Sequence, residues 1–158
     1  MTRRAGDQSG FTLLEMLVVI AIISMLAGLL MTGVTAARRK AAQRRTSLML
    51  QRIATAVENY ELDFGDYPDG CGDEVSGSLL YIALTTQEMN GPYLELQQSE
   101  LADQDFDGVK EIVDVWGHPI RYTHHKFYDG EPGRGKFRIS SLGRDGRPDT
   151  RDDLTNWD

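Results

Sequence analysis

Four aspartates lie close together near the C-terminus, and they are the densest group of potential ligands in the sequence. They fall within nine residues of a stretch that also contains glycine and proline, and they are Asp145, Asp149, Asp152 and Asp153. Carboxylates crowded on a tight loop repel one another unless a cation lies among them. Because hard oxygen ligands favour Ca²⁺, the pattern predicts a calcium site, and the alternative is a solvated acidic turn.

A second acidic loop has the spacing of an EF-hand. Its acids fall at positions 1, 3, 5, 9 and 12 of such a loop, and they are Asp103, Asp105, Asp107, Glu111 and Asp114. Gly108 stands at position 6, where the EF-hand turn requires glycine. Two features differ from the EF-hand pattern. Lys110 occupies a usually apolar position, and the last ligand is Asp instead of Glu. The loop is a candidate for a second calcium ion, and a purely structural role for Asp114 is the alternative.

No residue pattern in the chain indicates catalysis. The sequence contains no HExxH, GxSxG or phosphate-binding loop motif. Its three histidines are His118, His124 and His125. We interpret them as surface or edge-strand residues, since neighbours on a strand point to opposite faces. We expect Trp116 and Trp157 to belong to the core of the head, and we expect no enzymatic activity.

Composition and charge exclude several classes of protein. Eight basic and two acidic residues give residues 1–52 a net charge of +6, whereas nine basic and twenty-two acidic residues give the remainder −13. An acidic domain disfavours binding to nucleic acid. The single cysteine, Cys71, excludes an intramolecular disulfide and a thiolate zinc cage, and we interpret it as a partly buried free thiol.

Residues 16–34 form an apolar run of 19 residues without a charge or a proline. A helix needs about 20 such residues to cross a bilayer, and the run is longer than the apolar part of a signal peptide. Glu15 lies at the start of this run, where a carboxylate without a partner is costly and therefore indicates function. We predict a transmembrane helix, with a buried helix of a soluble protein as the alternative.

Basic residues flank the apolar run unevenly. Two of them precede it, and five follow it within residues 38–45. Charge counting alone would place the N-terminus outside the cytoplasm. The basic cluster of residues 38–45 suits membrane headgroups, acidic partners or salt bridges between subunits, and its role is not predicted.

The predicted helix continues well beyond the apolar run. Its apolar residues recur every three or four positions as an amphipathic stripe, and they are Met49, Ile53, Val57, Tyr60 and Phe64. Gly65, followed by a Tyr-Pro pair at residues 67–68, ends the helix. We predict one helix from about Phe11 to Phe64, with its first half in lipid or a filament core and its second half against a globular head.

The rest of the chain predicts a small head with antiparallel strands. Residues 113–122 predict a strand, a turn and a second strand, and the alternation of residues 136–142 predicts a third. Residues 78–85 predict a helix, and the remaining structure of residues 69–100 is not predicted. The predicted fold class is α+β, with the long N-terminal helix packed on a small antiparallel sheet.

The N-terminus resembles a known processing signal. The letters GFTLLE of residues 10–15, followed by the long apolar helix, are similar to the motif of type IV pilins and type II secretion pseudopilins. The resemblance implies that a prepilin peptidase cuts between Gly10 and Phe11 and methylates Phe11. It also implies that Glu15 pairs with the terminal amine of a neighbouring subunit and sets the register of assembly.

Two further motifs narrow the resemblance to the major pseudopilin of type II secretion, the general secretion pathway protein G family. One is DxWGxPxxY at residues 114–122, and the other is the tail SLGRDG … DDL … NW between residues 141 and 157. With the N-terminus and the Tyr-Pro pair, the resemblance covers about three quarters of the chain, all but about residues 69–100. It implies calcium bound in the tail, with Asp149 as an additional acid. The implied ligands are the side chains of Asp145, Asp152 and Asp153 and the backbone carbonyls of Leu142 and Thr150.

The resemblance implies a structural subunit of the type II secretion pseudopilus, which polymerises through its helix to drive export of folded proteins across the outer membrane. Minor pseudopilins and an inner-membrane assembly platform would be its partners, and nucleic acid would not. One alternative is a pilin-like subunit of a competence, adhesion or motility pilus, and another is a membrane-anchored calcium-binding module. The predicted segments are a cytoplasmic leader (1–10), a single transmembrane and assembly helix (11–35), an amphipathic helix (36–64) and a periplasmic head (65–158).

Overall fold

The computed structural model describes residues 11–70, 75–104, 106, 108–124 and 137–157, without the side chains of residues 29–32 and 75–76. Five residues that the sequence singles out lie outside this part, and they are Gly10, Cys71, Asp105, Asp107 and His125. The chain divides into two compact units, Met1–Lys40 and Ala41–Asp158, and each is described by itself.

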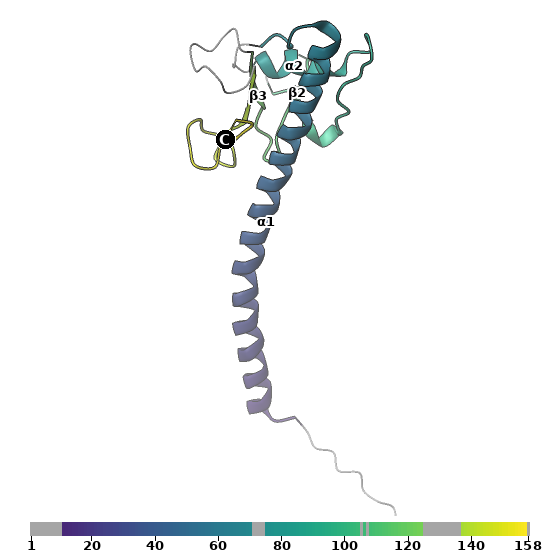
Figure 1. The fold of residues 1–158 in the computed structure, drawn as a ribbon. Coiled ribbons are helices and arrows are strands. Elements are labelled where there is room, and N and C mark those ends of the chain that lie inside the picture. Colours follow the sequence, from purple (N-terminus) through teal and green to yellow (C-terminus); the bar gives the residue numbers. More distant parts are fainter. Residues whose placement is uncertain (1–10, 71–74, 105, 107, 125–136, 158) are drawn as a thin grey trace, which may run out of the picture. The chain divides into compact units, whose positions relative to one another are not determined.

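One helix, α1 (Leu13–Phe64), takes up 52 residues and belongs to both units (Figure 1). It begins two residues later than predicted because Thr12 caps it. The Thr12 hydroxyl accepts a hydrogen bond from the N–H of Glu15 (3.2 Å), and the Glu15 carboxylate accepts one from the N–H of Thr12 (2.8 Å). The helix ends where predicted, because Gly65 adopts a φ of 77° and its N–H donates to the Glu61 carbonyl (2.8 Å).

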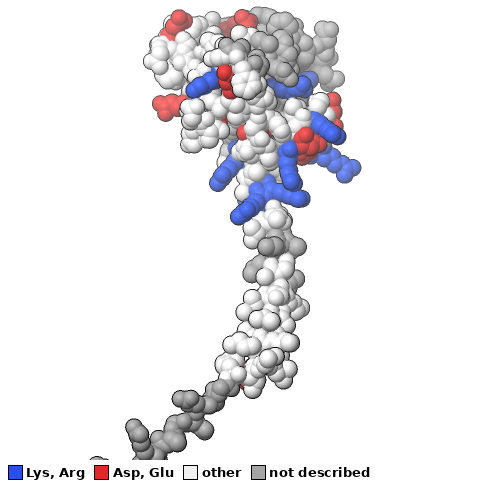
Figure 2. Space-filling model, turned by 180° about the vertical axis from the view of Figure 1, so that it is seen from behind, with Lys and Arg blue, Asp and Glu red and all other residues white. Residues whose placement is uncertain are grey.

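In the first unit, α1 presents apolar side chains on all of its faces. Between Leu13 and Leu26 the large apolar side chains are 43–84% exposed. Figure 2 shows this part of the helix as a nearly uninterrupted white surface. Its most apolar window of 18 residues has a mean hydropathy of 2.6, so α1 is long and apolar enough to cross a membrane. Apolar surface of this extent requires lipid or other chains to cover it.

The second unit builds its core against the later part of α1. Met49, Ile53 and Val57 of the predicted stripe are buried, with exposed fractions of 0–6%. The last two members of the stripe are less buried than these three: Tyr60 is partly buried and Phe64 is exposed. Their rings stack on each other with 4.3 Å between centroids, so they form an aromatic edge of the core rather than its centre.

The second helix, α2 (Val75–Thr85), contains the predicted helix of residues 78–85 and begins three residues earlier. Leu80 and Leu84 are completely buried in the same core as the stripe of α1. The Leu84 carbonyl accepts hydrogen bonds from the N–H groups of Tyr93 (2.9 Å) and Leu94 (3.0 Å). These bonds direct the chain after α2 back along the core.

A polar contact joins that returning segment to the end of α1. The Tyr93 hydroxyl donates to the Asp63 carboxylate (2.6 Å), and the Asn90 amide donates to it as well (3.0 Å). These donors, Tyr93 first, hold the pKa of Asp63 below its usual value. Desolvation and the neighbouring carboxylate raise the pKa of Tyr93 to about 12, so its hydroxyl keeps the proton that it donates.

The strands form two small antiparallel sheets instead of the single sheet predicted. After a short 3₁₀ helix (Gln98–Glu100), β1 (Leu101–Ala102) pairs with β2 (Glu111–Ile112). The second sheet has the order β3 (Arg121–His124), β4 (Phe137–Ser141), β5 (Leu154–Thr155).

The strands predicted within residues 113–122 differ from the observed ones, whereas the strand predicted at residues 136–142 is found. The first predicted strand, from Val113, is wrong, because β2 ends at Ile112 and Gly117 (φ 86°) holds the following residues in a turn. The second predicted strand is found only from Arg121 onward, as β3. Across that turn only the bridge of Val113 with Pro119 is formed. The third predicted strand is confirmed as β4, where buried and partly buried residues alternate.

The two tryptophans are less buried than predicted. Trp116 and Trp157 are both only partly buried. The Arg138 guanidinium lies over the Trp157 ring, 5.3 Å from its centroid, so this ring packs against a charged side chain at the surface of the sheet.

Two leucines that lie two positions apart on the helix test whether this core stabilises the head. Leu50 is 2% exposed and Leu48 is 64% exposed. Leu50→Ala is expected to lower the free energy of unfolding by about 2–5 kcal/mol, because it removes buried methyl groups and leaves a cavity. Leu48→Ala is expected to change it by less than about 0.5 kcal/mol. Urea unfolding followed by circular dichroism in detergent micelles measures both, and equal losses would contradict the described core.

Candidate functional site

The acidic tail, the connection between β4 and β5, brings three carboxylates together. Asp145, Asp152 and Asp153 each offer an oxygen, and these oxygens all lie within 4.8 Å of one another. The loop folds this tightly because of Gly143, whose φ is 63°. A Cβ at this position would lie 2.3 Å from the Asp152 carbonyl oxygen, so only glycine fits.

The Thr150 hydroxyl lies at the centre of the three carboxylates. Its Oγ1 is 2.8 Å from Asp152, 3.1 Å from Asp153 and 3.4 Å from Asp145. A hydroxyl has one proton to donate, so two of the three carboxylates face it without a proton between them. Donation from Thr150, followed by the N–H groups of Asp145 and Arg144, lowers the pKa of Asp152 and keeps it ionised.

This donor set fits a calcium ion. Three carboxylates and a hydroxyl are hard oxygen ligands, and the mutual repulsion of the carboxylates is what a divalent cation would relieve. The predicted carbonyl ligands, Leu142 and Thr150, belong to the same loop, and the Thr150 carbonyl accepts the N–H of Asp153 at 3.4 Å. Asp149 contributes its N–H to Asp153 (2.8 Å) rather than its carboxylate to the cluster.

The second acidic loop is described only in part, because Asp105 and Asp107 lie outside the described residues. Asp103 accepts the N–H of Gly108 (3.2 Å) with one oxygen, and its other oxygen is buried without a hydrogen-bond partner in the described part of the chain. Glu111 is buried and accepts hydrogen bonds from the Ser78 hydroxyl (3.2 Å) and the Gln104 N–H (3.0 Å). Among the described residues, the three tail aspartates form the only cluster of three acids close enough to share an ion. The second calcium ion therefore stays a prediction.

Asp114, which the EF-hand spacing placed at position 12 of the second acidic loop, connects two parts of the head through hydrogen bonds. The side chain is 2% exposed, and one oxygen accepts the N–H groups of Trp116 and His118, both at 2.9 Å. The other oxygen accepts the Ser141 hydroxyl at 2.6 Å, and the Ser141 oxygen accepts the N–H of Gly143 (3.1 Å). His118 adds a second link, because its Nδ1 lies 2.7 Å from the Gly143 carbonyl. Asp114 thus connects the Trp-Gly turn to the start of the acidic tail.

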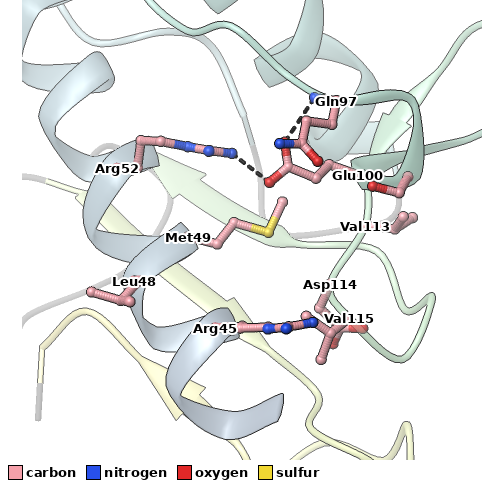
Figure 3. A pocket seen from close by; sticks show the side chains of 10 residues that line it. Arg45, Leu48, Met49, Arg52, Gln97, Glu100, Val113, Asp114 and Val115 are labelled. Carbon is pink, nitrogen blue, oxygen red and sulfur yellow. Dashed lines mark hydrogen bonds and ion pairs between the residues drawn. The ribbon is translucent and has the colours of Figure 1, made fainter. Parts of the chain in front are cut away.

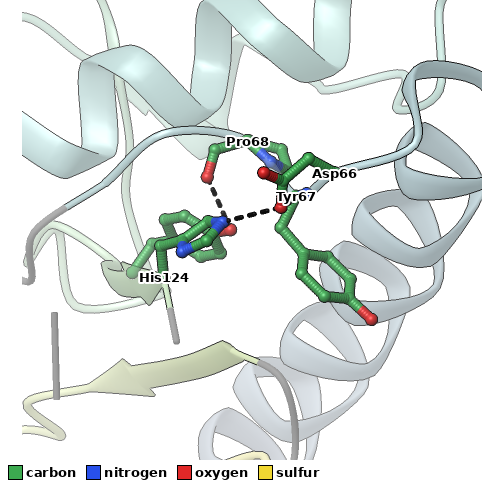
Figure 4. Close-up of polar contacts among 5 residues, drawn as sticks. Asp66, Tyr67, Pro68 and His124 are labelled. Atoms are coloured by element: carbon green, nitrogen blue, oxygen red, sulfur yellow. Dashed lines mark hydrogen bonds and ion pairs between the residues drawn. The ribbon is translucent and has the colours of Figure 1, made fainter. Parts of the chain in front are cut away.

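His124 is an edge-strand residue, as expected, because β3 lies at one edge of its sheet, but it is not at the surface. Its side chain is 1% exposed, and its Nε2 lies 3.1 Å from the Asp66 carboxylate, which follows α1 (Figure 4). Tyr122, two residues earlier on the same face of β3, donates its hydroxyl to the Pro68 carbonyl (2.8 Å). This face is buried because it packs against the segment that ends the helix, so His124 has a structural partner and is no candidate for catalysis.

The predicted processing segment is described from Phe11 onward. Phe11 is 70% exposed, and Glu15 accepts hydrogen bonds from both the N–H and the hydroxyl of Thr12, each at 2.8 Å. Thr12 was not among the predicted functional residues, although the Thr-x-x-Glu spacing is that of a capping box. The cut after Gly10 and the pairing of Glu15 with a neighbouring subunit stay predictions.

A groove of about 640 Å³ lies in the second unit between α1 and residues 97–115. Figure 3 shows Arg45 and Arg52 projecting from α1 across it, and Arg52 forms an ion pair with Glu100 (2.6 Å). Its described lining contains neither histidine nor cysteine.

Comparison with known proteins finds two family matches. Residues 6–31 match the prokaryotic N-terminal methylation motif. Residues 33–157, about four fifths of the chain, match the family described as type II secretion system (T2SS), protein G.

Individual relatives carry the same description along their whole length. The type II secretion system core protein G of Aeromonas hydrophila is 31% identical over 157 residues, covering 95% of this chain and 92% of the relative. That of Pseudomonas aeruginosa is 33% identical over 162 residues, covering 100% of this chain and 99% of the relative. A crystal structure of the major pseudopilin from the type 2 secretion system of enterohaemorrhagic Escherichia coli is 22% identical, with a TM-score of 0.47, and the match covers 78% of this chain and 92% of that one.

The structural role of Asp114 can be separated from a role as a metal ligand. Asp114→Ala is expected to lower the free energy of unfolding by about 3 kcal/mol or more, because buried donors that lose their acceptor cost about 1–3 kcal/mol each. A double-mutant cycle with Ser141→Ala is expected to give a coupling energy of about 1.5–3 kcal/mol. Urea unfolding in excess EDTA measures both values. A loss that disappears in EDTA would instead identify Asp114 as a calcium ligand.

Proposed function

The chain belongs to the type II secretion system protein G family, and we propose that it polymerises through its N-terminal helix into the pseudopilus that drives export of folded proteins across the outer membrane. It is a structural subunit of that pseudopilus. Membership also implies assembly with other components of the secretion system. The family is one of structural pseudopilins and is not a known class of enzyme.

The observation that supports polymerisation is the exposed apolar surface of α1 in the first unit. Its side chains from Leu13 to Leu26 are left open by the chain itself. In a single subunit lipid would cover them, and in a filament the helices of neighbouring subunits would take the place of lipid. A subunit of a competence or motility pilus would have the same kind of helix, but the match over residues 33–157 favours type II secretion.

We also propose the topology and partners that this role requires. The helix would cross the inner membrane once, with residues 1–10 in the cytoplasm and the head in the periplasm. Minor pseudopilins and the inner-membrane assembly platform would be its partners in the growing filament. The match of residues 6–31 to the N-terminal methylation motif supports a prepilin peptidase as a further partner, acting at Gly10 and Phe11.

Glu15 is proposed to set the register between subunits. Its carboxylate lies one helical turn from Phe11, the residue that cleavage would convert into the N-terminus. In lipid an ionised carboxylate requires a partner, and the methylated amine of the next subunit would supply the opposite charge. The hydrogen bonds from Thr12 hold the Glu15 side chain at this end of the helix.

Mass spectrometry of the protein purified from membranes tests the processing. The mature chain is expected to begin at Phe11 with one added methyl group. Gly10→Val is expected to leave the leader attached, because a side chain at this position obstructs the peptidase. Gly6→Val, a matched change within the same leader, is expected to be processed normally. Retention of the leader in the unmodified protein, or processing of Gly10→Val, would contradict the proposal.

We further propose that the acidic tail binds calcium. Asp145 follows β4, and Asp152 and Asp153 precede β5, so one ion would tie together the two ends of the connection. The ion would neutralise three carboxylates that otherwise repel one another. What supports this is their approach within 4.8 Å around the Thr150 hydroxyl.

Removal of calcium is expected to lower the midpoint of thermal unfolding by about 5–10 °C, measured at saturating calcium and again in EDTA. Asp152→Asn with Asp153→Asn should remove this difference, because the ion loses two charged ligands. Asp149→Asn, a matched change in the same loop but outside the cluster, should preserve it. A midpoint that does not respond to EDTA would rule out a tail ion that stabilises the head.

The same preparation distinguishes one ion from two. Calorimetric titration with calcium should give one ion per chain if only the tail binds. Two ions, reduced to one by Asp103→Asn, would place a second ion in the loop of residues 103–114.

A further inference from the structure

Three consecutive basic residues follow the apolar part of α1 in the first unit. They are Arg38, Arg39 and Lys40, and all three side chains are exposed. Three small uncharged residues at positions 35–37 separate them from the end of the apolar run. Figure 2 shows blue side chains projecting from the helix directly after its uncharged stretch.

The three cations point away from the helix in different directions. Successive residues of an α-helix are rotated by about 100°, so these side chains spread over about 200° of its circumference. A single protein partner would contact one face of the helix. Lipid headgroups, by contrast, surround a membrane helix on all sides. They can therefore contact all three cations at once.

The cations also lie at the depth of headgroups. The apolar run of residues 16–34 is about 28 Å long as a helix, close to the roughly 30 Å of a hydrocarbon core. Arg38 and Lys40 then lie about 6 and 9 Å beyond its end, in the polar layer of the bilayer. Their long side chains can adjust to the phosphate level while the methylene groups stay in the interface.

No acidic side chain among the described residues forms an ion pair with these three cations. No Asp or Glu occurs between Glu15 and Glu58 in the sequence. In the described part of the chain, the ion pairs found are Arg52 with Glu100 and His124 with Asp66. The placement also runs against the charge distribution that orients most membrane helices, so orientation does not account for it.

We propose that Arg38, Arg39 and Lys40 bind the phosphate groups of anionic phospholipids at the membrane surface. The guanidinium groups offer paired donors to phosphate oxygens, and Lys40 adds a point charge. The bound headgroups hold a single subunit at a fixed depth, and a subunit that enters a filament has to release them. This inference rests on the membrane anchoring proposed above.

The test places the full chain in phosphatidylcholine vesicles with a trace of spin-labelled phosphatidylglycerol or spin-labelled phosphatidylcholine. Electron spin resonance measures how much of each label is immobilised beside the protein. The association constant for phosphatidylglycerol relative to phosphatidylcholine is expected to be about 3 or more. It is expected to fall to about 1 in the triple variant Arg38→Gln, Arg39→Gln, Lys40→Gln, and to fall for the unmodified chain in about 1 M salt, which screens charges beyond about 3 Å.

A charge-matched control removes three cations from the exposed surface of the tail, with Arg144→Gln, Arg147→Gln and Arg151→Gln. This variant is expected to keep the lipid preference. A ratio near 1 for the unmodified chain, or an unchanged ratio in the triple variant, would overturn the inference. Self-association of the chains can be measured by energy transfer between labelled chains. If the triple variant lost self-association but kept the lipid preference, the inference would also be overturned, because the cations would then contact acidic groups of other chains.

Vesicle flotation separates this inference from the anchoring on which it depends. A chain that floats without preferring phosphatidylglycerol refutes the inference alone. A chain that does not float with vesicles refutes the anchoring, and the inference with it.

Discussion

The apolar surface of α1 that the chain cannot bury is the constraint on which the rest of the structure depends. The hydrophobic core of the second unit includes the later part of α1, where residues such as Ile53 and Val57 are completely buried. The earlier part has no such covering, and Leu13 is 84% exposed. Burial of apolar surface is the main favourable contribution to folding and association. The protein therefore reaches its lowest free energy only in a membrane or in an assembly.

The parts of the fold that depend on local periodicity could be predicted from the sequence. The long helix, its end before Gly65 and the alternating strand β4 all follow from the spacing of apolar and turn residues. The parts that depend on distant contacts could not. His124 is buried against the segment that follows α1, where it also meets Asp66, 58 residues earlier, and no local pattern indicates those contacts. The division of the strands into two sheets likewise depends on which segments meet in space.

The candidate site shows the same limit. The crowding of four aspartates on a short glycine-containing loop was sufficient to predict a cation site, but the resemblance, not the spacing, implied which three of them converge. The contribution of the Thr150 hydroxyl was missed, since a threonine in an acidic loop has no pattern of its own. Asp114 fitted an EF-hand spacing and a Trp-Gly motif equally well. Its contact with Ser141, 27 residues away, is what gives it a structural role.

The position of β5 has a consequence for how subunits behave beside one another. This strand of two residues pairs with one edge of β4, and Asn156 extends the pairing through two hydrogen bonds with Ile139 (2.8 and 3.1 Å). If β5 detached, β4 would present unpaired N–H and C=O groups along an open edge. Open strand edges recruit strands from other chains and lead to aggregation. The pairing of β5 with β4 therefore covers an edge through which heads would otherwise associate strand to strand.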